Sequence, residues 1–205
     1  MNKDLFYYSV GTGLIGAPVS LYQLIKLNGI RVKPLQFTTL CSRVLPVHIA
    51  IKTVQIEACT PFCQAFNPWV GFALSGIIQG GVYGQLNIFY SKALKISKVN
   101  PSYIGCMRGW VFAALRDTGS QGIPYMFSNS WGSLIILSIT STYLTQFVHN
   151  CQTTMHVYQD LGYSQAIQKT FKDKRSLYKG AEARIGLLLM TNIMNDMFLP
   201  WKKKD

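Results

Sequence analysis

Charged residues are scarce in this sequence, and acidic residues are the scarcest. Asp, Glu, Lys and Arg make up 14% of the 205 residues, whereas they make up about a quarter of a typical soluble domain. Two long stretches, 58–91 and 118–159, contain none of the four. Each exceeds the roughly 20 apolar residues that a helix needs to cross a bilayer. This scarcity predicts an integral membrane protein.

Motifs that mark enzymes, metal sites and nucleotide sites are also missing. The five cysteines show no paired CxxC spacing, so we expect neither a disulfide framework nor a zinc site. A GxGxxG pattern at 11–16 follows no predicted strand, and it therefore indicates no nucleotide site. The three histidines have no carboxylate at triad or metal-ligand spacing, and no nucleophile is paired with a base. We expect no catalytic activity, no metal and no cofactor.

The positive charges follow a topological pattern. Six spans are predicted, and Lys and Arg occur in the first, third and fifth connections but not in the second and fourth. This is the positive-inside pattern, and it puts both termini on the opposite face, although Lys202, Lys203 and Lys204 depart from it. A formal net charge of +12 would also suit a nucleic-acid partner, but the restriction to alternate connections argues against one. The spans lie near 5–27, 43–66, 69–92, 110–130, 131–155 and 181–201.

An internal repeat supports this organisation. Met107 to Trp110 opens one apolar run and Tyr178 to Ala181 opens another, and each has a basic residue followed by Gly. In the same register, Phe127 of the first run aligns with Phe198 of the second. The spans then group into three pairs, 5–66, 69–130 and 131–201, within a single domain, 1–205. Between the last two spans, 164–176 has alternating apolar and basic faces, which predicts a short amphipathic helix at the surface.

Two segments carry a family resemblance. The first is MRGWVFAALRDTGSQGIPYMF, residues 107–127, and the second is YSQAIQKTFKDKRSLYKGAEARIG, residues 163–186. Both resemble segments of the mitochondrial carrier family, and together they cover about a quarter of the chain. The resemblance implies an all-α membrane protein with six transmembrane helices in three pseudo-repeated pairs. It also implies the mitochondrial inner membrane, with both termini toward the intermembrane space.

The charged gates of that family are lost here. The odd-numbered carrier helices end in a Pro, an acid two residues later and a base three further on, but the first span reads Pro18, Ser20 and Gln23. Without these charges the alternating closed states have no evident switch. Bulky apolar residues near the former charged positions predict a narrowed central cavity: Leu86, Phe89, Val148 and Leu187.

Two sets of residues are candidate sites. Arg116 and Asp117 lie within a predicted span, where ionisable groups are costly. They contact a solute, as a vestige of carrier function, satisfy each other, or line a water-filled cleft near the matrix face. The other set lies at the basic starts of two spans, where helix N-termini and matrix-side charge favour phosphate. By resemblance, these residues are expected to bind cardiolipin: Arg108, Gly109, Trp110, Lys179, Gly180 and Ala181.

Three functions follow as hypotheses. The leading one is a non-catalytic, carrier-like accessory subunit of a larger inner-membrane assembly, either a respiratory complex or supercomplex or ATP synthase. Its partners would be other subunits and membrane lipid, without nucleic acid. The alternative is an active transporter of a small amino-acid-like or anionic metabolite that uses Arg116 and Asp117. A third is an unrelated six-helix channel or assembly factor.

Overall fold

All regular secondary structure in the described part of the chain is helical. The computed structural model describes residues 3–96, 107–158, 160–172 and 177–199. The predicted all-α class is therefore confirmed. The elements are α1 (Lys3–Asn28), α2 (Pro34–Ala65), α3 (Pro68–Ala93), α5 (Trp110–Asp117), the π-helical η1 (Thr118–Gly122), α6 (Ile123–Phe127), α7 (Trp131–Val157), α8 (Tyr163–Lys172) and α9 (Ala181–Phe198).

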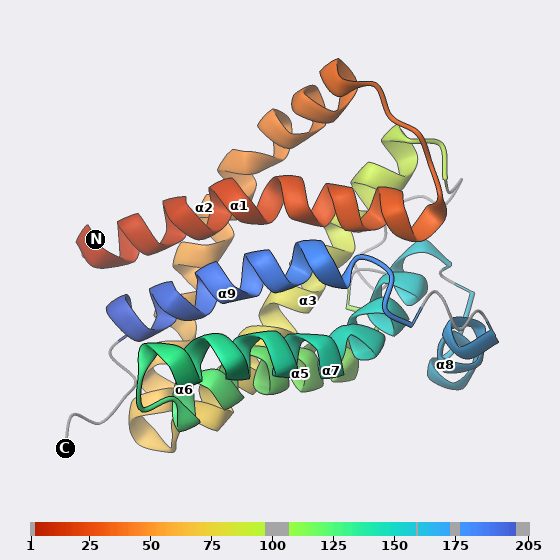
Figure 1. The fold of residues 1–205 in the computed structure, drawn as a ribbon. Helices are drawn as coiled ribbons and strands as arrows, with labels where there is room; N and C mark the ends of the chain where they lie inside the picture. Colours follow the sequence, from red (N-terminus) through yellow and green to blue (C-terminus); the bar gives the residue numbers. More distant parts are fainter. Residues whose placement is uncertain (1–2, 97–106, 159, 173–176, 200–205) are drawn as a thin grey trace.

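The long helices close into a ring in chain order. α1 packs on α2, α2 on α3, α3 on α5, α5 and α6 on α7, α7 on α9, and α9 again on α1. Figure 1 shows α1, α9 and α7 side by side, with α2 and α3 crossing behind them and α8 at one end. α1 begins and α9 ends at the same end of the ring, where Tyr8 Oη donates a hydrogen bond to Asn195 Oδ1 at 2.9 Å.

The prediction of six membrane-spanning helices is wrong for the described residues. None of the helices there combines the length and the apolar character that crossing a bilayer requires. The reason is that a stretch without charge is not necessarily apolar. α7 contains no Asp, Glu, Lys or Arg, yet its buried side is largely Ser, Thr, Gln, Asn and His, and these residues lower its mean hydropathy.

Local sequence signals explain where several helices begin. α3 starts at Pro68 after Asn67, whose side chain accepts a hydrogen bond from the Val70 N–H at 3.2 Å. Ser130 and Ser133 form a capping box at the start of α7. α2 begins at Pro34, nine residues before the predicted start of the second span at 43. α8 matches the predicted amphipathic helix as far as Lys172, and 173–176 lie outside the described residues.

The two sequence repeats have matching boundaries in the structure. Gly109 and Gly180 are the N-caps of α5 and α9, with φ of 74° and 81°, a left-handed conformation that only Gly adopts without strain. From these caps, 110–127 and 181–198 both run as helix to a Phe, and Ser128 and Leu199 then leave in extended conformation. The predicted pairing of Phe127 with Phe198 is thus seen in the helix ends.

The interior of the ring is apolar near its ends and polar between them. One apolar cluster includes Tyr8, Phe72 and Tyr125 at the end where the ring's first and last helices meet. Another, which includes Leu24 and Tyr90, lies toward the opposite end of α1. Between them the buried side chains are mostly polar or charged, and this middle layer holds the candidate site.

Candidate functional site

Arg116 and Asp117 lie at the centre of the polar layer. They end α5, and their relative exposures are 4% and 2%. Arg116 Nε donates to Asp117 Oδ1 at 2.6 Å, and Arg116 Nη1 donates to Gln152 Oε1 of α7 at 2.7 Å. The wide turn of η1 follows directly, as is frequent at functional positions in helices. The two side chains are thus bonded to each other and to α7.

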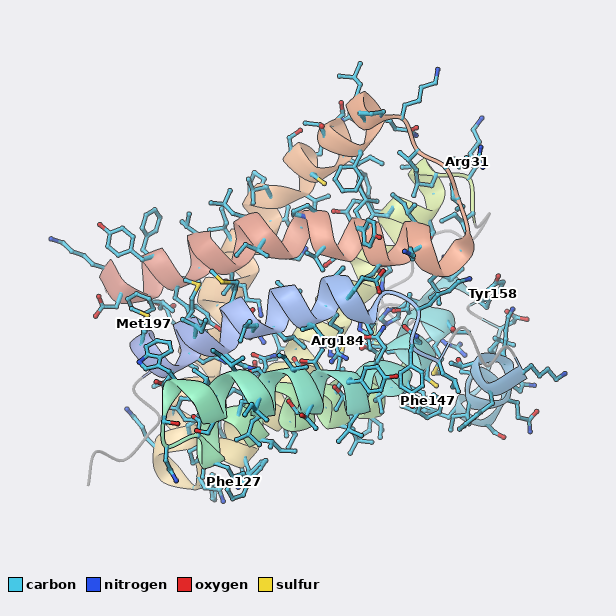
Figure 2. All side chains as sticks on the ribbon, viewed as in Figure 1. Arg31, Phe127, Phe147, Tyr158, Arg184 and Met197 are labelled. Carbon is cyan, nitrogen blue, oxygen red and sulfur yellow. The ribbon has the colours of Figure 1, made fainter. Side chains whose placement is uncertain are left out.

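Arg184 of α9 brings a second buried guanidinium to this layer. Its Nη1 donates to the Thr142 carbonyl at 3.2 Å and to Gln146 Oε1 at 3.4 Å, and its Nη2 donates to Thr145 Oγ1 at 3.1 Å. Figure 2 shows Arg184 between α9 and α7, inside the ring, and Phe127 at its rim. Arg184 thus donates to one backbone carbonyl and two side chains, all of them on α7.

α7 lines this layer with neutral polar groups. Gln146 Nε2 donates to Asn150 Oδ1 and to the Lys179 carbonyl, both at 3.0 Å, and Asn150 Nδ2 donates to the Leu177 carbonyl at 3.1 Å. These bonds join α7 to the segment that precedes α9. They stabilise the ring without adding charge to its centre.

The electrostatic balance of the layer is positive. Two guanidiniums and Lys52 are buried there with one carboxylate, that of Asp117. Burial lowers the pKa of His149 well below its usual value, and the charges of Arg184 and Arg116 lower it further, so the ring of His149 is neutral. Burial also lowers the pKa of Lys52 to about 8, although Asp117 opposes the shift. The layer therefore suits an anion better than a cation.

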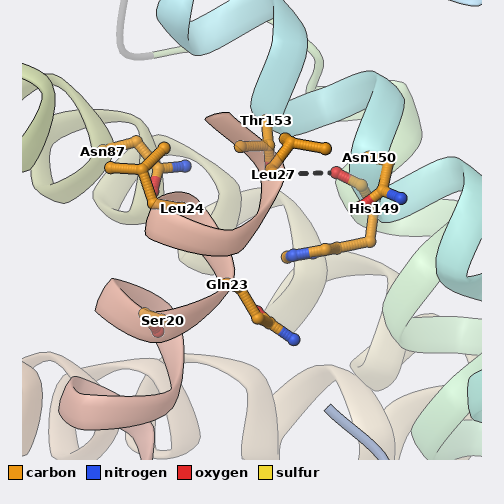
Figure 3. A pocket seen from close by; sticks show the side chains of 8 residues that line it. All are labelled: Ser20, Gln23, Leu24, Leu27, Asn87, His149, Asn150 and Thr153. Carbon is orange, nitrogen blue, oxygen red and sulfur yellow. Dashed lines mark hydrogen bonds between the residues drawn. The ribbon is translucent and has the colours of Figure 1, made fainter. Parts of the chain in front are cut away.

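The space inside the layer is small. A cavity of about 30 Å³ is bounded by both arginines, Asp117, Gln23 and His149, among others. A second cavity of about 10 Å³ shares Gln23 and His149, and Figure 3 shows these two side chains reaching from α1 and α7 into the same space. Since one buried water needs roughly 10–15 Å³, the two cavities have room for water molecules and not for an amino-acid-like solute.

Three polar atoms at these cavities have no hydrogen-bond partner among the described residues. They are Gln23 Nε2, His149 Nδ1 and Asp117 Oδ2. Buried polar groups are rarely left unsatisfied, and each of these atoms can bond to water in the spaces just described. The layer is therefore a hydrated polar core rather than an open solute cavity.

The narrowed cavity was predicted, but with the wrong residues. Leu187 does line the larger cavity. Phe89 is 39% exposed and faces outward, and Val148 packs in a different cluster beside Phe112. The side chain of Leu86 lies outside the described part. Bonded polar side chains, chiefly those of Arg116 and its partners, fill the centre instead.

The six predicted lipid-binding residues fall into two separate groups. Arg108 donates to the Leu161 carbonyl, and the Arg108 carbonyl bonds to His156 Nε2 at 2.9 Å. Lys179 Nζ instead approaches the Leu27 carbonyl at 3.5 Å. Gly109 and Gly180 are buried and have left-handed backbones, Ala181 is buried, and Trp110 is 48% exposed.

The glycines of the two groups make equivalent contacts with neighbouring helices. A Cβ on Gly109 would lie 3.3 Å from Gln152 Cγ, and one on Gly180 would lie 3.4 Å from Gln23 Cγ. Each glycine therefore faces a glutamine on the next helix of the ring, α7 in one case and α1 in the other. The repeat found in the sequence extends to this contact.

Sequence reasoning missed Arg184 as a member of the polar layer. The repeat register pointed to Leu187, which aligns with Arg116, and suggested that α9 provides no charge. Arg184 is three residues before Leu187, and residues at that spacing share a helix face. A search of the whole inward face, rather than of one aligned position, would have found it.

Comparison with protein-family models, with curated proteins and with solved structures gives no match to this chain. The resemblance to mitochondrial carriers therefore rests on its sequence motifs, and it stays a prediction.

Proposed function

We propose that this chain is a non-catalytic, carrier-like accessory subunit of a larger assembly of the mitochondrial inner membrane, a respiratory complex or ATP synthase. The observation that carries the proposal is an inverted distribution of polarity. The inside of the ring is polar and closed, and its outside is rich in large apolar side chains. Such a body offers little room for a solute within it and presents apolar side chains that partners can cover.

The closed interior argues against solute transport. A solute in the centre would have to displace the bonds of Arg116 to Asp117 and Gln152, and those of Arg184 to α7. Charge-assisted bonds of this kind contribute roughly 1.5–3 kcal/mol each. A solute would therefore have to replace several of them in a space that now has room for water only.

The outer surface argues for partners. On α7, the buried polar side is opposed by an outward side with Ile136 65% exposed and Leu144 71% exposed. α2 likewise exposes Val54, at 61%, and its C-cap Phe66 is 70% exposed. Single exposed apolar residues are normal, but large continuous patches mark interaction surfaces. Neighbouring subunits that cover these helices would remove the apolar area from water.

Cardiolipin belongs to the same proposal. Arg108 and Lys179 each precede a left-handed glycine at the start of a helix, where the helix dipole and the basic side chain both favour phosphate. The two groups are separate, so we propose two lipid contacts: one at Arg108, Gly109 and Trp110, and another at Lys179, Gly180 and Ala181.

One experiment tests both partners and lipid. The tagged chain is purified from its native membrane in mild detergent, and its mass is measured by native mass spectrometry. We expect a large complex with bound cardiolipin for the wild type, dissociation for Leu144→Arg, and reduced cardiolipin occupancy for Lys179→Gln. Gln168→Arg and Lys172→Gln, both on the exposed side of α8, are the matched controls and should behave as wild type.

A free particle of about 23 kDa plus detergent would count heavily against a subunit role. In liposomes, saturable solute exchange that Arg116→Ala abolishes would instead establish the transporter alternative. Unchanged cardiolipin occupancy in Lys179→Gln would reject the lipid contacts. The subunit role would then be judged only by whether the chain is purified as part of a large complex.

A further inference from the structure

A third, larger cavity lies away from the polar layer, at the end of the ring where α1 begins and α9 ends. Its volume is about 330 Å³, and its walls come from three helices: Leu5 and Tyr8 of α1, Ile56 and Pro61 of α2, and Phe198 at the end of α9. Pockets that bind small molecules have volumes of roughly 300–1,000 Å³ and mostly apolar walls with a few polar groups. This cavity meets both criteria.

The polar groups at this cavity are hydrogen-bond acceptors. The Glu57 carboxylate lies at its exposed rim, and no hydrogen bond or ion pair joins Glu57 to another described residue. Pro61 has no N–H, so it cannot donate to the Glu57 carbonyl, which is its helical partner four residues earlier. The side chain and the main chain of Glu57 therefore both offer acceptors.

The hydroxyl groups of the cavity have committed their protons elsewhere. Tyr8 Oη donates to Asn195 Oδ1 at 2.9 Å, and Thr60 Oγ1 donates to the Ile56 carbonyl at 2.8 Å. Neither proton is therefore available for donation to a ligand. An apolar space with a carboxylate and further acceptors at its rim is complementary to an apolar body with a cationic donor.

We propose that this cavity, which we call the Glu57 pocket, binds a small apolar molecule with a protonated amine. The apolar body occupies the space between Leu5, Ile56 and Phe198, and the ammonium group donates to Glu57. The ligand is a free small molecule, since a volume of about 330 Å³ suits a compact body better than a pair of acyl chains. This site is independent of the proposed subunit role.

The test compares two probes of the same shape, 4-phenylbutylamine and the neutral 4-phenylbutan-1-ol, by titration calorimetry on the purified full chain. Because the two probes partition into detergent to different extents, each affinity is referred to the free probe concentration, and the comparison with Glu57→Gln isolates the contribution of the carboxylate. We expect the wild type to bind the amine about tenfold more tightly than the alcohol, as one charge-assisted hydrogen bond provides. Glu57→Gln should abolish this preference and leave the affinity for the alcohol unchanged. Glu182→Gln, an exposed acid on α9, should retain the preference.

A third variant, Thr60→Trp, should fill the cavity and abolish binding of both probes, and circular dichroism verifies that each variant is folded. Equal affinities of the wild type for amine and alcohol would overturn the proposal, and so would a preference that survives in Glu57→Gln or an absence of binding by either probe. Displacement of the amine by dihexanoyl phosphatidylethanolamine at lower concentration than by free amine would reassign the site to a lipid head group.

Discussion

The left-handed backbone at Gly180 should make substitutions there destabilise the α1–α9 junction. Gly180 has φ of 81°, where a side chain costs roughly 1–2 kcal/mol. The Cβ of an alanine there would meet Gln23 Cγ at 3.4 Å, an ordinary contact distance. Strain therefore outweighs crowding, and Gly180→Ala should lower the melting temperature by roughly 2–8 °C, since 1 kcal/mol corresponds to about 2–4 °C at this chain length.

Two other glycines provide matched controls for this substitution. Gly29 also has a positive φ, 66°, but nothing lies within 4 Å of its virtual Cβ, so Gly29→Ala introduces strain without a contact and should be similarly destabilising. Gly186 lies inside α9 with open space around it. Gly186→Ala should therefore raise stability by about 0.5–1 kcal/mol.

A larger residue at Gly180 separates strain from crowding. Asn adopts the left-handed region more readily than Ala, so Gly180→Asn should be less destabilising than Gly180→Ala despite its greater size. Thermal unfolding of the purified chain, followed by circular dichroism, measures all four variants. If Gly180→Asn proved more destabilising than Gly180→Ala, or if Gly186→Ala were as damaging as Gly180→Ala, the reasoning from φ would be refuted.

Two further predictions concern the buried ionisable groups. Burial is the largest cause that lowers the pKa of both His48 and His156 to about 4. Below pH 6.5 the two histidines therefore bind protons in the unfolded chain but not in the folded chain. Acidification from pH 7 to 5 should reduce the free energy of unfolding by about 2 kcal/mol per histidine. A melting temperature that is equal at pH 7 and 5, or as steeply pH-dependent in His156→Gln as in the wild type, would contradict this. Asp117→Asn should lower the free energy of unfolding by roughly 3–5 kcal/mol, because it leaves Arg116 buried without its carboxylate. Glu182→Gln breaks the exposed pair with Lys26 and should lower it by under about 1 kcal/mol. Similar losses for the two variants in urea unfolding would argue that the buried pair has no special role.

Features that depend on local sequence could be predicted. The all-α class followed from the predicted spans and from the carrier resemblance, and the repeat followed from the matching Arg108-Gly109 and Lys179-Gly180 pairs. The left-handed caps at both glycines were not predicted, although they are a local property of the same pairs. The surface helix at 164–176 was recognised from its two faces, and α8 occupies most of it.

Features that depend on packing could not be predicted in the same way. The membrane-spanning assignment treated a lack of charge as apolarity, but Ser138, Gln146 and Asn150 face inward on a helix with no charged residue. Arg184 was overlooked because only the position aligned with Arg116 was considered, and which partners Arg184 meets depends on how α9 rotates against α7. That rotation is set by the whole ring.

Gln23, which stands where the carrier resemblance would place a gate charge, links the sequence and the closed centre. An alternating carrier needs contacts that form in one state and break in another, with a few kcal/mol of difference between them. Gln23 faces Gly180 and lines both central cavities, and it presents a neutral amide there. Beside it, His149 is neutral and Arg116 is held by Asp117 within its own chain. Gln23 and His149 therefore bring no charge to this part of the centre, and the bonds of Arg116 to Asp117 and Gln152 hold it closed.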